Sequence, residues 1–318
     1  MNILEVLDLT TWFPIKRGIL SKTTGHIRAV DGVNLKIKKG EVLGLVGESG
    51  CGKTTLGRTI LGLENAREGK ALFFGKDLFA MTRHEKKKIK KRIQIIFQDS
   101  LSSLNPGMNI IDILTEGLVQ FGMLEKNKIS HAINLLHEVG LDENALYRYP
   151  HEFSGGQRQR INIARAVSIR PDFVVCDEPV SALDVSVQAQ IINLFLDLKE
   201  KYRLSYLFIS HDLSVVSSIA NKLAVMYLGK IVEYGPVEAV ISSPGHPYTQ
   251  ALIDAVPVPG IYKKERKILK GEIPSPSAPP PGCRFHTRCP ETKKICKAQE
   301  PPEVISGERH VWCHLYKG

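Results

Sequence analysis

The octapeptide GESGCGKT, from Gly47 to Thr54, constrains the fold of this chain more strongly than its composition does. The apolar run EVLGLVG leads into it and predicts a buried strand, and KTTLGRTILGL follows with apolar residues at helical spacing. Glycines in such a loop let the backbone curl until successive N–H groups face one anion, and the helix N-terminus completes the concavity. Strand, loop and helix together predict a phosphate-binding loop.

Two residues of this loop have expected roles toward a nucleotide. Lys53 is expected to reach the β and γ phosphates, and the hydroxyl of Thr54 is expected to bind Mg²⁺. Cys51 stands at a variable position of the motif, and we interpret it as an inert filler rather than a redox sensor.

A second motif, FVVCDEP from Phe173 to Pro179, reads as a buried strand that delivers two adjacent carboxylates at its C-terminal end. Asp177 is expected to hold Mg²⁺, usually through water, and Glu178 to orient and polarise an attacking water. Cys176 is interpreted as a small core residue. Together with the phosphate-binding loop, this pair of acids predicts a nucleotide hydrolase.

Strand-like and helix-like segments alternate along most of the chain, which predicts an α/β domain with a largely parallel central sheet. Two amphipathic patterns between Asn109 and Val139 break the alternation and predict a helical insertion. After Pro257 the composition turns to proline, serine and glycine, as in IPSPSAPPPG, which is typical of a linker or an irregular arm.

Composition limits the location and the partners of the chain. It has 318 residues, 43% of them hydrophobic, and a formal net charge of +10, which leaves nucleic acid or an anionic membrane surface open as partners. No apolar run approaches the roughly 20 residues that a membrane span needs, and MNILEVLDLT lacks the basic start of a secretory signal. We therefore expect a cytoplasmic protein, in which structural disulfides are rare. The basic run RHEKKKIKKR is interpreted as a solvated surface segment.

The stretch FSGGQRQR, from Phe153 to Arg160, with FQDS upstream and SALD and LFISHD downstream, resembles the ATP-binding subunits of ABC transporters. Phe153 stands where that family more often has leucine, a mild departure at a packing position. The resemblance covers residues 1–257 and implies an ATP-binding domain there, with a helical subdomain at about 99–165 and an N-terminal antiparallel β subdomain. It also implies that two such domains bind head to tail around two ATP molecules.

The resemblance assigns roles to individual residues. Glu178, His211, Lys53 and Gln98 form the expected catalytic set, in which Gln98 also touches Mg²⁺ and senses a transmembrane partner, while Thr54 and Asp177 complete the Mg²⁺ ligands. The signature residues are expected to face the ATP held by the partner domain, and Asp184 to cross the dimer interface. Phe13 is favoured over Trp12 as the residue that stacks on adenine, although either could be plain core. The full set expected to contact nucleotide is Phe13, Val30, Gly47, Glu48, Ser49, Gly50, Cys51, Gly52, Lys53, Thr54, Thr55, Gln98, Ser154, Gly155, Gly156, Gln157, Asp177 and Asp184.

The C-terminal part of the chain resembles one subgroup of these ATPases. SPGHPYTQALIDAVP and PSPSAPPPGCRFHTRCP resemble the extension found in the ATPases of oligopeptide and dipeptide importers, a group that includes some nickel importers. The resemblance implies a peripheral protein on the cytoplasmic face of the membrane that powers peptide import. Its implied partners are permease subunits, a second homologous ATPase subunit in a heterodimer, with a homodimer as the alternative, and, through the permease, an extracytoplasmic peptide-binding protein.

Two other functions remain open at this point. One is import of nickel or another small solute, and the other is a soluble ABC ATPase that acts on nucleic acid. The single phosphate-binding loop and the lack of a heptad stretch disfavour the nucleic-acid alternative.

Four of the six cysteines lie in residues 258–318, the expected extension, spaced C-x5-C-x6-C-x16-C. The spacing lacks the close C-x2–4-C pairs of most zinc sites and departs from the ferredoxin pattern. Because members of the resembled group carry a [4Fe–4S] cluster in this extension, Cys283, Cys289, Cys296 and Cys313 are expected to hold one. A zinc site, which could include His286, His310 or His314, and free thiols are the alternatives.

Overall fold

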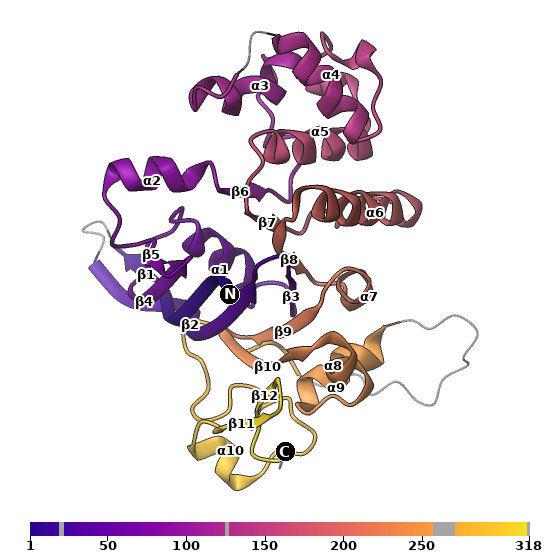
Figure 1. The fold of residues 1–318 in the computed structure, drawn as a ribbon. Coiled ribbons are helices and arrows are strands. Elements are labelled where there is room, and N and C mark those ends of the chain that lie inside the picture. The colour runs from indigo at the N-terminus through magenta and orange to yellow at the C-terminus, as the bar shows by residue number, and fades with distance from the viewer. Residues whose placement is uncertain (19–21, 125–126, 257–270, 317–318) are drawn as a thin grey trace. The chain divides into compact units, whose positions relative to one another are not determined.

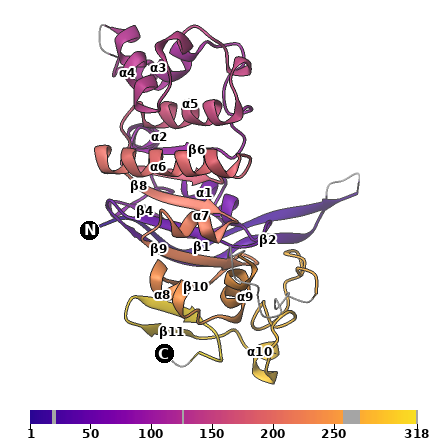
Figure 2. The same ribbon diagram turned by 90° about the vertical axis from the view of Figure 1, so that its right-hand side faces the viewer.

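The computed structural model describes residues 1–18, 22–124, 127–256 and 271–316. The chain forms two compact units, Met1–Ala80 with Ile209–Gly318 as unit 1, and Met81–Phe208 as unit 2. Figures 1 and 2 show the elements of both units. The predicted boundary at 257/258 lies outside the described residues.

Unit 1 begins with an antiparallel sheet. Its strands are β1 (Asn2–Arg17), β2 (Lys22–Lys38), β4 (Glu68–Phe73) and β5 (Lys76–Asp77), in the order β2-β1-β4-β5. Strands β1 and β2 form a long hairpin, which is visible in Figure 2. The N-terminal antiparallel β subdomain implied by the sequence is therefore confirmed.

Five further strands of unit 1 follow one another in the order β11-β12-β10-β9-β3. They are β3 (Val42–Val46), β9 (Lys222–Tyr227), β10 (Lys230–Pro236), β11 (Glu303–Ser306) and β12 (Arg309–Trp312). Strand β3 runs parallel to β9 and is buried at all five positions, as expected from its continuous apolar run. The helices of this unit are α1 (Lys53–Ile60), α7 (Leu213–Ser217), α8 (Val237–Ser242), α9 (Pro247–Ala255) and α10 (Lys294–Ala298).

The C-terminal extension contains a hairpin that its composition did not indicate. Strand β12 pairs with β11 and also, in antiparallel register, with β10, so that Glu233 lies opposite Val311. Figure 1 shows β12 next to β10, with β11 on its other side. The extension is therefore packed against the sheet of unit 1.

Unit 2 contains a parallel strand pair and a group of helices. Strand β6 (Ile93–Ile96) pairs in parallel with β7 (Phe173–Asp177). Strand β8 (Ser205–Ser210), whose last two residues belong to unit 1, follows β7 in the sheet order. The α-helices are α2 (Arg83–Lys90), α3 (Ile110–Gln120), α4 (Lys128–Glu138), α5 (Gly155–Val167) and α6 (Val185–Tyr202). Two 3₁₀ turns, Glu143–Ala145 and Pro150–Glu152, lie between α4 and α5.

The helical part of unit 2 agrees with two expectations. Helices α3 and α4 form where the two amphipathic patterns predicted them, and they pack on each other and on α5. Helix α2 coincides with the basic run and buries none of its residues, so this segment is a solvated helix, held at its start by a capping box between Thr82 and Glu85. No helix in the described part of the chain combines the length and the apolar character that a membrane span requires.

Candidate functional site

The phosphate-binding loop lies between β3 and α1, as its sequence predicts. Gly50 and Gly52 have φ of +76° and +110°, a region that side-chain-bearing residues rarely adopt. A Cβ on Gly52 would collide with the carbonyl oxygen of Ala29, so both the backbone angle and the available space require glycine there. The loop ends at Lys53, the first residue of α1, and Thr54 and Thr55 follow in its first turn.

Lys53 lies inside the curl of this loop. Its side chain is 4% exposed, and its Nζ donates to the carbonyl oxygens of Gly47 (2.7 Å) and Glu48 (3.1 Å). Cys51 is also buried, with Sγ 3.8 Å from Lys53 Nζ, and burial raises the pKa of its thiol. The thiol therefore stays neutral, which agrees with an inert filler.

The carboxylate strand β7 brings two predicted residues to the end of the parallel pair. All five residues of β7 are buried, and Asp177 is 2% exposed. Glu178 follows with φ of +45°, an unusual backbone angle for a residue with a side chain. Its Oε2 accepts a hydrogen bond from Gln98 Nε2 at 3.1 Å, and its carbonyl oxygen accepts from the backbone N–H (3.3 Å) and Oγ (3.1 Å) of Ser181.

The signature segment opens α5. Ser154 is the N-cap, and a capping box joins it to Gln157: Ser154 Oγ accepts from Gln157 N at 3.3 Å, and Ser154 N donates to Gln157 Oε1 at 3.0 Å. A Cβ on Gly156 would lie 2.7 Å from Val187 Cγ1 on α6, so glycine permits the close approach of these helices. Phe153 is 4% exposed beneath the Arg148 guanidinium, which confirms a packing position.

Residues Asp184 and His211 are both exposed. Asp184 is the N-cap of α6, and its side chain makes no capping hydrogen bond. His211 follows β8 directly, and the next residue, Asp212, caps α7 by accepting from Ser214 N at 2.8 Å.

The two candidates for adenine stacking differ in their surroundings. Arg28 and Arg67 place their guanidinium carbons 4.7 and 4.1 Å from the centroid of the Trp12 ring, whose Nε1 donates to Asp31 Oδ1 at 3.1 Å. Phe13 lies two residues from Thr11, whose Oγ1 is 3.0 Å from Thr59 Oγ1 on α1. The pairing of β1 with β2 is irregular between Thr11 and Trp12, and Trp12 and Phe13 are both half-buried.

The predicted site residues fall into two sets. Unit 1 carries Phe13, Val30, which is completely buried, the loop residues 47–55 and His211. Unit 2 carries Gln98, Ser154, Gly155, Gly156, Gln157, Asp177, Glu178 and Asp184.

The expectation for the four tail cysteines is wrong on this geometry. The described residues include all four, and they contain no group of three or more His, Cys, Asp or Glu side chains that could hold a metal ion. This finding argues against the [4Fe–4S] cluster and equally against the zinc alternative. Burial raises the pKa of Cys283 to about 11 and also raises the pKa values of Cys289 and Cys313.

The three tail histidines have other partners. His286 Nδ1 lies 2.9 Å from the carbonyl oxygen of Cys283, His310 Nδ1 lies 2.6 Å from Glu303 Oε1, and His314 Nε2 lies 3.0 Å from the carbonyl oxygen of Gln299. The tail is held instead by packing and ion pairs, since Phe285 is 1% exposed and Arg309 donates to the buried Glu233.

Two contacts of the site have no signal in the sequence. Tyr248 and Arg288 both bond to Glu48 of the phosphate-binding loop, although they lie 200 and 240 residues away along the chain. No motif or spacing connects these positions, and only the structure brings them together.

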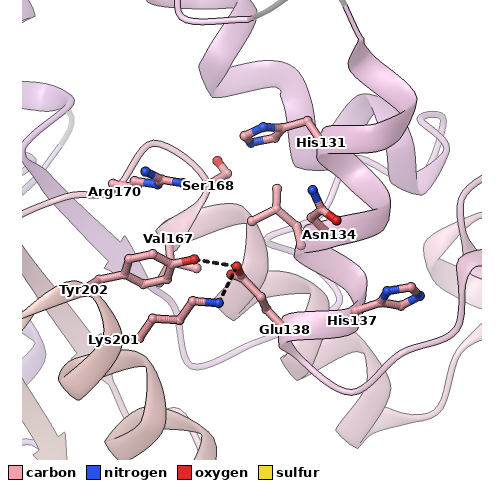
Figure 3. Close-up of a pocket in the computed structure, with 10 residues that line it drawn as sticks. His131, Asn134, His137, Glu138, Val167, Ser168, Arg170, Lys201 and Tyr202 are labelled. Atoms are coloured by element: carbon pink, nitrogen blue, oxygen red, sulfur yellow. Dashed lines mark hydrogen bonds and ion pairs between the residues drawn. The ribbon is translucent and has the colours of Figure 1, made fainter.

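Unit 2 also has a cavity of about 380 Å³ near the ends of α4 and α6. Glu138 Oε1 accepts there from Lys201 Nζ at 2.8 Å and from Tyr202 OH at 2.6 Å, as Figure 3 shows. None of the predicted site residues lines this cavity.

Comparison with known proteins places these features in one group. The ABC transporter family model matches residues 30–181, and the model for the C-terminal region of oligopeptide/dipeptide transporters matches residues 232–296. The oligopeptide transport ATP-binding protein AppF of Bacillus subtilis is 50% identical over 99% of this chain and 98% of its own length. The oligopeptide transport ATP-binding protein OppF of Salmonella typhimurium is 47% identical over 97% of this chain and 94% of its own.

Solved structures agree on the fold. CbiO1 of Clostridium perfringens, part of the ABC transporter complex cbiONQ, superposes with a TM-score of 0.65 at 26% identity, over 76% of this chain and 91% of that one. The ATP-binding cassette MJ0796, solved as a dimer bound to ADP and Pi, superposes with a TM-score of 0.65 at 25% identity, over 74% of this chain and 98% of that one.

Proposed function

This chain belongs to the family of ABC transporter ATP-binding proteins, and we propose that it hydrolyses ATP to power the import of di- or oligopeptides across the cell membrane. The observation that carries the proposal is the combination of a formed phosphate-binding loop with the Gln98–Glu178 pair in a chain that matches oligopeptide transport proteins over nearly its whole length.

The loop residues suit the phosphates of ATP. Backbone N–H groups between Glu48 and Thr54, at the N-terminus of α1, would surround the phosphate oxygens. Lys53 Nζ, now bonded to carbonyl oxygens of the loop, would exchange these acceptors for the β and γ phosphates. Phe13 would stack on the adenine, because Trp12 is occupied by Arg28 and Arg67.

The described oxygen donors also fit Mg²⁺, which prefers carboxylate, amide and hydroxyl oxygens. Thr54, Gln98 and the buried carboxylate of Asp177 would hold it. When bound, the ion would neutralise charge on the phosphates.

Glu178 is the proposed general base for the attacking water. The hydrogen bond from Gln98 and the two bonds from Ser181 fix the orientation of its carboxylate and its backbone. His211 would contact the γ-phosphate. A base held in this way requires little rearrangement when water attacks.

The signature residues Ser154, Gly155, Gly156 and Gln157 would bind the ATP held by a second ATPase subunit, with Asp184 at the shared interface. The position of these residues at the start of α5 supports this role, because the positive end of the helix dipole favours an anion. The proposed working complex contains this chain, a second homologous ATPase and two permease subunits, with the ATPases on the cytoplasmic face. An extracytoplasmic binding protein would deliver the peptide.

A reconstitution experiment tests this function. Proteoliposomes that contain the chain with its permeases and second ATPase, supplied with the extracytoplasmic binding protein, should take up a labelled tri- or tetrapeptide only when ATP is present on the side of the membrane that carries the ATPase subunits. Uptake of Ni²⁺ without peptide would overturn the substrate assignment, and no ATP hydrolysis at all would overturn the enzyme assignment.

A further inference from the structure

All polar groups of Glu48, in the phosphate-binding loop, are engaged. Its backbone N–H donates to Tyr248 OH at 2.8 Å, and its carbonyl oxygen accepts from Cys51 N at 3.2 Å and Lys53 Nζ at 3.1 Å. Its carboxylate accepts two bonds from one guanidinium, from Arg288 Nη1 to Oε2 at 2.6 Å and from Arg288 Nη2 to Oε1 at 2.9 Å. Two of these partners come from the last quarter of the chain.

The ion pair with Arg288 differs from an ordinary surface pair. The Arg288 side chain is 6% exposed, and that of Glu48 is 25% exposed. A paired, two-pronged contact adds geometric specificity to the charge attraction, and in a dry environment water screens it less. Loss of either partner would leave a largely buried charge without its counterion.

A buried aromatic cluster, made of Tyr227, Tyr248 and Phe285, lies behind this contact. The Tyr248 ring lies 4.7 Å from that of Tyr227 and 5.4 Å from that of Phe285, measured between centroids, and all three residues are at most 1% exposed. Phe285 belongs to the C-terminal extension, three residues before Arg288. The cluster therefore packs the extension, through Phe285, against α9 and β9, which carry Tyr248 and Tyr227.

We propose that the C-terminal extension holds the phosphate-binding loop in its nucleotide-receiving conformation through Glu48, with Arg288 and Tyr248 as positioning residues. The inference rests on the proposed function, because it concerns binding of ATP by the same loop. Gly50 and Gly52 leave the loop conformationally free in the absence of external contacts, so an anchor on Glu48, two residues before Gly50, lowers the entropy that nucleotide binding costs. The extension thereby sets the ATP affinity of a loop that it does not itself contain.

The test is equilibrium binding of fluorescently labelled ATP, with Mg²⁺, to the purified full-length chain. Arg288→Gln should weaken binding about tenfold, which corresponds to about 1.4 kcal/mol. Arg288→Lys should lie between this variant and wild type, because an ammonium keeps the charge but cannot make the two-pronged contact. The matched control is Glu300→Gln, which breaks an ion pair between the extension and Lys230 (2.6 Å) that does not touch the loop, and it should bind ATP as wild type does.

A double-mutant cycle shows whether Arg288 acts through Glu48. Glu48→Gln, Arg288→Gln and the double variant should lose similar affinity, since each removes the same contact. For Arg288→Gln alone, the hydrolysis rate of the assembled transporter at saturating ATP should remain within about twofold of wild type, because the substitution should raise KM rather than lower kcat. Additive losses in the cycle would overturn the positioning role.

Tyr248→Phe provides a second variant that keeps the buried ring and removes only the hydroxyl. Tyr248→Phe should weaken ATP binding about threefold. It replaces Arg288→Gln as the test if thermal unfolding shows that Arg288→Gln does not fold. Wild-type affinity in both Tyr248→Phe and the folded Arg288 variants would overturn the inference while leaving the proposed function intact. Failure of the wild-type chain to bind ATP would instead overturn the proposed function, and the inference with it.

Discussion

Gln98 Nε2 donates a hydrogen bond to Glu178 Oε2 at 3.1 Å, which joins two residues 80 positions apart in the sequence. Each follows a strand of the parallel pair β6 and β7, and the carboxyl ends of parallel strands lie at the same edge of a sheet. The pair therefore links the segment expected to sense the permease with the proposed general base.

Replacement of that base should separate ATP binding from hydrolysis. In Glu178→Gln, turnover by the assembled transporter should fall at least about 100-fold, the low end of the contribution of a positioned general base. ATP binding should persist, because the phosphate-binding loop is unchanged. The ATPase dimer should remain closed, because the bound ATP is not hydrolysed. ATPase assays and size-exclusion chromatography with ATP measure these effects.

Lys53→Ala is the complementary variant. It should weaken ATP binding, because the buried ammonium is removed from the loop.

For the prediction on Glu178→Gln, near-normal hydrolysis would show that another group activates the water.

Phe13→Ala should lower nucleotide affinity by about 1–3 kcal/mol, the scale of stacking between a base and an aromatic ring. Trp12→Ala should instead lower the unfolding free energy, because it removes the packing of Arg28 and Arg67 and the hydrogen bond to Asp31. Equilibrium binding of labelled ATP and urea unfolding of both variants distinguish these effects. If only Trp12→Ala weakens binding, the assignment of the stacking residue is wrong.

Gly156→Ala should destabilise the protein by about 1–3 kcal/mol, the usual cost of overpacking. The added methyl group would lie 2.7 Å from Val187 Cγ1, whereas a methyl group on Gly155 would lie 3.7 Å from Leu183 Cδ2, an ordinary contact. Gly155→Ala is therefore the matched control for stability. Val187→Ala should restore much of the loss in the double variant, and a failure of this rescue would show that the contact with α6 is not the cause.

Stability should depend on the protonation of His246. This side chain is 1% exposed, and burial lowers its pKa from 6.5 to about 3. The unfolded chain therefore binds a proton between those values that the folded chain does not, so the free energy of unfolding should fall as pH drops below about 6.5, by up to about 1.4 kcal/mol per pH unit.

His246→Asn is the control for this pH dependence. His246 Nδ1 accepts from Tyr248 N at 3.0 Å as the N-cap of α9, and asparagine can cap a helix without titrating in this range. Between pH 7 and pH 5 the variant should lose less stability than wild type in urea unfolding. Equal losses would show that other groups carry the pH dependence.

The sequence by itself determined the local parts of the site. The loop from Gly47 to Thr54, the acids that end β7 and the helix that begins after Ser154 all formed as predicted. Each depends on contacts within a few residues: glycines that curl a loop, an apolar strand that ends at a carboxylate, and a serine that caps its own helix. Such contacts have a fixed spacing in sequence, so that a pattern is sufficient to find them.

Only the tertiary structure decided which residues contact one another when they lie far apart in the sequence. It showed that β12 pairs with β10, that two arginines cover Trp12, and that the tail cysteines form no metal-holding group among the described residues. It also brought Arg288 to Glu48, 240 residues away. Separation along the sequence does not fix the distance between two residues in space once several elements lie between them. Closing such long loops costs chain entropy, and buried contacts between the distant residues offset this cost. No local sequence pattern predicts which residues make these contacts.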